Sequence, residues 1–153
     1  MLRLGVLALL LACGSVFVAA QGHSTAHASI QHTCGLTDRQ FIENYEVQME
    51  AVGMYGNDYL SGNAKAEDLI SASQDAARSV RSSAPFDPSL QLVKRLAPGM
   101  FYAYAEAVKT RAAGGNPNRE MYTAYMVSER VRDVLREAEP GLTAAGCDIS
   151  NML

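Results

Sequence analysis

The stretch TDRQFIENYEVQMEAVGMYGNDY, residues 37–59, places its larger apolar side chains at steps of three and four residues. These side chains are Phe41, Tyr45, Met49, Val52, Tyr55 and Tyr59. Such spacing puts them on one face of an α-helix, because a helix completes a turn in about 3.6 residues. Thr37 and Gln40 form a T-x-x-Q capping box before the first apolar residue, and the polar residues 61–63 interrupt the pattern. The sequence therefore predicts a first helix over residues 37–60.

A second and a third helix follow with start and stop signals of their own. Asn63 is expected to cap the second helix, which extends from residue 64 to about residue 83. Asp87 as cap and Pro88 in the first turn begin the third helix, and Gly114-Gly115 ends it. Pro98 lies inside this third pattern. Because proline removes a backbone donor and clashes with the preceding turn, we expect a kink or a split near Pro98.

Asn116 and Pro117 begin a fourth helix, and Pro140-Gly141 is expected to end it at Glu139. No segment alternates apolar and polar residues in the manner of a strand, so we expect no sheet. Four helices with short connections predict an all-α fold, an antiparallel four-helix bundle over residues 37–153.

Residues 1–20 have the pattern of an export signal, with Arg3, an apolar run and then small residues at the cleavage position. Removal of this leader would make Gln21 the first residue of a secreted or extracytoplasmic protein. As an alternative, LLACGS at residues 10–15 resembles the bacterial lipobox, in which the cysteine is lipidated. That alternative implies a lipoprotein held at a membrane through Cys13. The excess of arginine over lysine favours a bacterial source.

Cys34 and Cys147 remain after the leader and lie near the two ends of the domain. An even pair of cysteines in an exported chain predicts a disulfide. Two free thiols, or a metal site shared with His32, are the alternatives.

The charge pattern argues against several classes of function. The chain has a net charge of −3 and no basic stripe, so nucleic acid is not an expected partner. No metalloprotease, phosphate-loop or serine-hydrolase motif occurs, and Glu129 and Asp133 are interleaved with arginines as on a solvated face. We therefore expect a protein that is not an enzyme. A small helical enzyme with a site between helices is the alternative.

Tyrosine and methionine recur together: the chain has seven of each and no tryptophan. Four pairs stand four residues apart and so touch on one side of a helix: Tyr45 with Met49, Met100 with Tyr104, Met121 with Tyr125, and Tyr122 with Met126. The pairs indicate a surface for a protein partner or a pocket for an apolar ligand such as haem or lipid, where phenols donate hydrogen bonds or ligate iron. Ordinary core packing is the alternative.

All three histidines lie in residues 21–36, which are polar and are expected to form a disordered arm. An N-terminal Gln21-Gly22-His23 would offer an amine, two amide nitrogens and an imidazole, the square-planar set that selects Cu(II) or Ni(II). His27 and His32 would add ligands for a further ion. The arm is otherwise a spacer. The sequence thus predicts an exported binding protein, with copper or nickel binding by the arm as the alternative.

Overall fold

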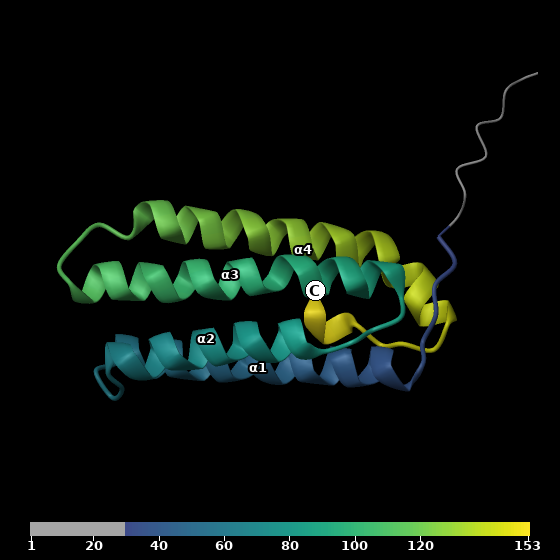
Figure 1. Ribbon diagram of the computed structural model, residues 1–153, viewed down its shortest axis with the longest axis horizontal. Coiled ribbons are helices and arrows are strands. Elements are labelled where there is room, and N and C mark those ends of the chain that lie inside the picture. Colours follow the sequence, from purple (N-terminus) through teal and green to yellow (C-terminus); the bar gives the residue numbers. More distant parts are fainter. Residues whose placement is uncertain (1–29) are drawn as a thin grey trace, which may run out of the picture.

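In the computed structural model of this protein, residues 30–153 are described and fold into four long helices followed by a short 3-10 helix (Figure 1). The elements are α1 (Leu36–Leu60), α2 (Ala66–Ser82), α3 (Pro88–Ala112), α4 (Asn118–Ala144) and η1 (Ser150–Met152). These residues include no strand, and consecutive helices run antiparallel. The prediction of an all-α four-helix bundle is confirmed.

The four helices do not all pack against their neighbours to the same extent. Each helix packs on its neighbour in sequence, whereas α1 and α4 make little direct contact. The C-terminal segment turns back from the end at which α4 finishes and runs to the middle of the molecule, where η1 contacts α1 (Figure 1). Ile149 and Met152 of this segment are buried in the core. One half of the space beside α1 is therefore filled by the chain's own tail.

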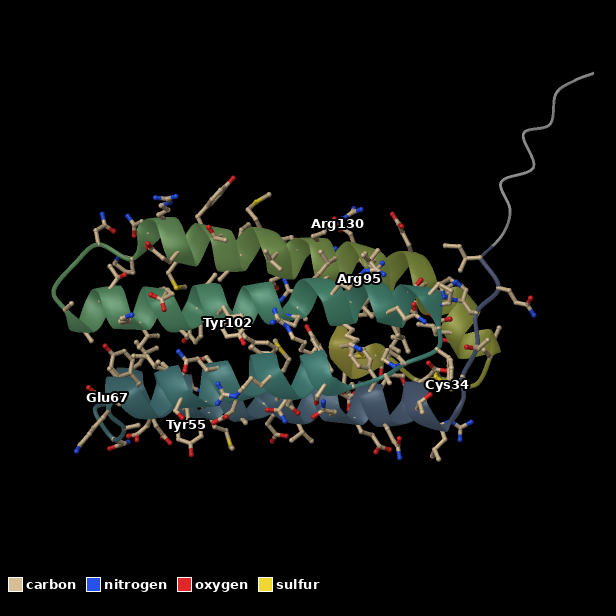
Figure 2. All side chains as sticks on the ribbon, in the orientation of Figure 1. Cys34, Tyr55, Glu67, Arg95, Tyr102 and Arg130 are labelled. Carbon is tan, nitrogen blue, oxygen red and sulfur yellow. A yellow bond between two sulfur atoms is a disulfide. The ribbon has the colours of Figure 1, made fainter. Side chains whose placement is uncertain are left out.

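The core contains the apolar faces that the sequence predicts. Phe41, Tyr45 and Phe101 form a chain of rings, with centroids 6.3 and 6.5 Å apart. These separations lie in the range in which aromatic rings attract one another beyond their area burial. On α2 the buried side chains are mostly small, so this helix packs closely between its neighbours. Tyr102 of α3 lies between α3 and α2, 5.7 Å beneath the guanidinium of Arg81 (Figure 2).

Three of the predicted helix starts are wrong in detail, and at α4 the cap is Pro117, although Asn116 was expected as the cap and Pro117 as the first helical residue. At α1 the cap is Gly35, and Gly35 N donates to Asp38 Oδ2 at 2.8 Å, so Asp38 replaces Gln40 as the residue that closes the first turn. Among the described residues Thr37 Oγ1 is buried and has no hydrogen-bond partner. At α2 the cap is Lys65 and not Asn63, because Lys65 N donates to the Asp68 carboxylate at 3.0 Å.

The start of α3 and the ends of α1 and α3 follow the predictions. The Asp87 carboxylate accepts hydrogen bonds from the first-turn amides of Ser89 and Leu90 at 2.8 and 3.2 Å. Gly62 and Gly114, just beyond α1 and α3, both have φ of 77°, a left-handed conformation that glycine adopts without strain.

The two internal prolines do not end their helices. α3 runs unbroken through Pro98, so the split that we considered does not occur (Figure 1). α4 continues past Pro140 to Ala144, so the predicted end at Glu139 is wrong. Pro140 and Arg136 are both exposed, and water can therefore hydrogen-bond the Arg136 carbonyl that proline leaves free.

Cys34 and Cys147 form the predicted disulfide, with Cα atoms 5.5 Å apart. This separation is within the usual range for a disulfide. Cys34 lies at the end of the bundle where α1 begins (Figure 2). The bond therefore joins the start of α1 to the tail that follows α4.

Candidate functional site

A pocket of about 460 Å³ lies between α1, α3 and α4. The α1 wall consists of Met49, Val52, Gly53, Gly56, Asn57 and Leu60. The floor on α3 consists of Met100, Phe101 and Tyr104, and the α4 wall of Met121, Ala124, Tyr125, Ser128 and Arg132. The α1–α2 and α3–α4 connections both lie at the end of the bundle toward which Leu60 and Met121 of the pocket lining are placed (Figure 1). Its volume is in the range of small-molecule sites.

The pocket exists because α1 has little side chain where it faces α4. Gly53 and Gly56 stand on that face, and a Cβ added at Gly53 would meet no atom within 4 Å. At Gly56 a Cβ would lie 3.1 Å from the Tyr104 hydroxyl, so this glycine makes room for the phenol. The tail lies along the neighbouring part of the same α1 face, where η1 contacts α1 and a second hollow of about 380 Å³ remains between Ile42 and Glu46 of α1 and Cys147 and Asn151 of the tail. The pocket is the part of the space between α1 and α4 that the C-terminal tail does not occupy.

Five of the eight predicted tyrosine and methionine residues line the pocket. They are Met49, Met100, Tyr104, Met121 and Tyr125. Tyr45 belongs to the core beneath, because it is 4 % exposed and packs on the floor residue Phe101. Tyr122 and Met126 are 65 % and 48 % exposed and lie outside the lining.

The sequence analysis missed the small and polar lining residues. Met49, Gly53, Gly56 and Leu60 follow one another at helical steps, so two glycines stand on the same face as two large apolar side chains. Glycine inside a helix is unfavourable, and its repeated use on one face is a signal for a close approach or an open space. Ser128 and Arg132 stand one turn apart on α4 and carry no comparable signal.

Arg132 is the only charged residue in the pocket lining, although the whole chain has a net charge of −3. Its Nη1 donates to Glu129 Oε1 at 2.7 Å, and Glu129 itself is not part of the lining. An arginine has five N–H donors, so this bond leaves donors for a further acceptor. The end of the pocket at Arg132 therefore has guanidinium donors available for an acceptor in the pocket.

The phenols near the pocket are held in their neutral form. Burial raises the pKa of Tyr45 to about 12, and the Arg132 guanidinium acts in the opposite direction. Burial also raises the pKa of Tyr104, with a smaller contribution from Tyr59. Both hydroxyls therefore remain hydrogen-bond donors at neutral pH, and neither supplies a phenolate for a cationic ligand.

His32 has a structural role that the sequence analysis did not anticipate. His32 Nδ1 donates to Asp87 Oδ2 at 3.0 Å, and the neighbouring Thr33 N donates to the same oxygen at 3.0 Å. The imidazole ring lies against Gly141, where an added Cβ would overlap it. Residues 32–35 are therefore held against the bundle, although residues 21–36 were expected to form a disordered arm. The proposed ligands Gln21, Gly22, His23 and His27 lie outside the described residues, as does Cys13.

The carboxylates of the described chain offer no second candidate site. Glu129 and Asp133 pair with Arg132 and Arg136 at 2.7 and 3.5 Å, on the charged face that the sequence indicates. Within residues 30–153 no cluster of three or more histidine, cysteine, aspartate or glutamate side chains has the arrangement of a metal site. In the same range no helix has the length and apolar character needed to cross a membrane.

Comparison with protein families, curated proteins and solved structures gave no match to this chain. The pocket is therefore the feature of this protein that bears on its function.

Proposed function

We propose that this protein is a binding protein, not an enzyme, that holds an apolar small molecule in the pocket between α1, α3 and α4. The observation that carries the proposal is an open, largely apolar space of about 460 Å³ where a four-helix bundle would ordinarily close its last seam. Such a space costs packing energy, because its lining atoms lose contacts that a filled core would have. A ligand restores those contacts.

The chemistry of the lining supports binding over catalysis. The lining has three methionines, whose side chains adapt to ligands of different shape, and two tyrosines that offer hydrogen bonds at the rim. No aspartate, glutamate, histidine or cysteine belongs to it. Acid–base and nucleophilic catalysis depend mainly on those side chains.

An extracytoplasmic location is part of the proposal. The Cys34–Cys147 disulfide supports it, because disulfides persist in oxidising compartments and are rare in the cytosol. The leader pattern of residues 1–20 agrees with this location.

A titration with Nile red, a neutral dye whose emission shifts to the blue in apolar surroundings, tests the proposal. The key variant is Gly53→Leu, because a side chain at this position enters the open pocket without meeting another atom at its Cβ. We expect the wild-type protein to shift the dye emission and to saturate, and Gly53→Leu to lose the shift while keeping its helical circular dichroism.

Met54→Leu is the matched control. It puts the same side chain on the next residue of α1, which is 56 % exposed and outside the pocket. This variant should bind the dye as the wild type does. Equal binding by Gly53→Leu and the wild type would show that the dye, and by extension the ligand, does not occupy this pocket. A Soret-band titration with haem on the same variants would distinguish haem from a lipid as the occupant.

A further inference from the structure

The pocket is elongated, and its two ends have different lining residues. Its α4 wall runs from Met121 to Arg132 and its α1 wall from Met49 to Leu60, eleven residue steps along each helix. At a rise of 1.5 Å per residue each wall is about 16 Å long. Because α1 and α4 are antiparallel, Leu60 lies near Met121 and Met49 lies near Arg132. The pocket is thus a trough with a mostly apolar lining and with the Arg132 guanidinium at the end away from Leu60 and Met121.

The end of the trough at Arg132 has the donors of an anion site. Arg132 belongs to the lining, and Ser128 stands one helical turn before it on the same face of α4. Among residues 30–153 the one carboxylate bonded to Arg132 is that of Glu129, which lies outside the lining and takes one of the five guanidinium donors. An anionic group in the trough would meet arginine and serine donors and no lining carboxylate.

The remaining surface of the trough suits a hydrocarbon chain. Phe101 and Met100 form a buried floor, 2 % and 8 % exposed, and Leu60 and Met121 form the two sides at the far end. These side chains offer dispersion contacts and no hydrogen bonds. Asn57, Tyr104 and Tyr125 are the polar side chains of this part of the lining, and a ligand with polar groups along its whole length would find few hydrogen-bond partners beyond them.

From this geometry we infer that the ligand is a single-chain anionic amphiphile. Its carboxylate or phosphate head group lies at Arg132 and Ser128, and its chain extends along the floor toward Leu60 and Met121. This inference depends on the proposed function, since it names the class of ligand for the same pocket. Free fatty acids and monoalkyl phosphates share the required chemistry.

Displacement of Nile red by four twelve-carbon compounds, each below its micelle concentration, tests the inference. The compounds are dodecanoate, dodecyl phosphate, dodecanol and dodecyltrimethylammonium. We expect an anionic compound to displace the dye from the wild-type protein at a concentration on the order of tenfold lower than dodecanol, and the cation to be weakest, as for a hydrogen-bonded charge pair. The better of dodecanoate and dodecyl phosphate identifies the head group.

The Arg132→Gln variant should bring the anionic compounds and dodecanol to equal potency. Arg136→Gln is its matched control, because Arg136 stands one turn later, pairs with Asp133 three residues before it as Arg132 pairs with Glu129, and is not in the lining. This control should keep the preference of the wild type. Equal potency of all four compounds on the wild type, or an anion preference that survives Arg132→Gln, overturns the inference while leaving the apolar pocket in place. If Arg132→Gln does not fold, the wild-type series alone decides. Absence of dye binding to the wild type would instead refute the proposed function.

Discussion

Gly141 of α4 is in contact with His32, which lies in the segment just before α1. The His32 ring lies against it, and the hydrogen bond from His32 to Asp87 depends on that contact being free of a side chain. Gly141 follows Pro140 inside α4, so this turn of the helix lacks both an amide hydrogen bond and a Cβ. These two residues would destabilise an isolated helix, but here they leave space in which the His32 ring packs against α4.

Gly141→Ala should therefore destabilise the protein, although alanine favours a helix more than glycine does. Displacement of the ring would remove the His32–Asp87 hydrogen bond and leave a buried carboxylate short of a donor, at a cost of about 1–3 kcal/mol. The measurement is urea unfolding at neutral pH. Gly53→Ala is the control, since its Cβ would meet no atom within 4 Å, and it should be stabilising by about 0.5–1 kcal/mol. Equal stability of the two variants would mean that the ring does not depend on Gly141.

Single residues were predictable from the sequence where one local rule had no competitor. Asp87 before Pro88, and glycines at 62 and 114, satisfy helix-end rules that depend only on the backbone. The predicted capping box at Thr37 was wrong because a second helix start, with Gly35 as its cap, lies two residues earlier. Asp38 accepts from Gly35 N, whereas Gln40 was expected to accept from Thr37 N two residues later, and only the fold shows that Asp38 has further partners.

At the scale of the elements, Asp38 ties the start of α1 to the connection between α2 and α3. Its Oδ1 accepts from Phe86 N and Asp87 N at 2.7 and 2.9 Å. Its Oδ2 accepts from Gly35 N at 2.8 Å and from Thr33 Oγ1 at 3.3 Å. The side chain is fully buried, so these four donors replace the water that an exposed carboxylate would have.

Asp38→Asn tests this link with almost no change of volume. The amide nitrogen of asparagine would face donors in place of an acceptor, and one pair of hydrogen bonds would be lost in a buried site. We expect a loss of about 2–4 kcal/mol in the free energy of unfolding. Asp68→Asn is the matched control because Asp68 is exposed and accepts a backbone hydrogen bond only from Lys65 N, at 3.0 Å. If the two variants lose the same small amount by chemical denaturation, the buried network is not a major source of stability.

The sequence predicts which residues share one face of a helix, but it does not predict which faces of two helices leave a pocket between them. Met121 and Tyr125 line the pocket, whereas Tyr122 and Met126, one position further along α4, lie outside the lining, although all four side chains are exposed. The two pairs have the same composition and spacing, and periodicity within one helix cannot say which pair faces α1. The seam depends on the tail occupying its other half, which is a long-range property of the chain.

At the scale of the whole molecule, the Cys34–Cys147 bond closes a loop across a separation of 113 residues. In the chain-entropy account, a loop of that length restricts the unfolded state by about 4–5 kcal/mol. Replacement of both cysteines by serine should therefore lower the thermal midpoint markedly, and reduction of the wild type should lower it by a similar amount. Scanning calorimetry with and without reductant measures both. A midpoint that reduction leaves unchanged would mean that the bridge adds no stability.

Asp38, His32, Gly141 and the disulfide all lie at the end of the bundle where α1 begins, and the pocket lies toward the other end. Asp38 and Gly53 are fifteen residues apart on α1, or about 22 Å along its axis. Free-energy changes from substitutions further apart than about 10 Å usually add independently. The disulfide and the buried hydrogen bonds therefore lie at one part of α1, and the open pocket lies at another. The shape of the pocket can change over generations, or by design, while the contacts at the start of α1 keep the chain folded.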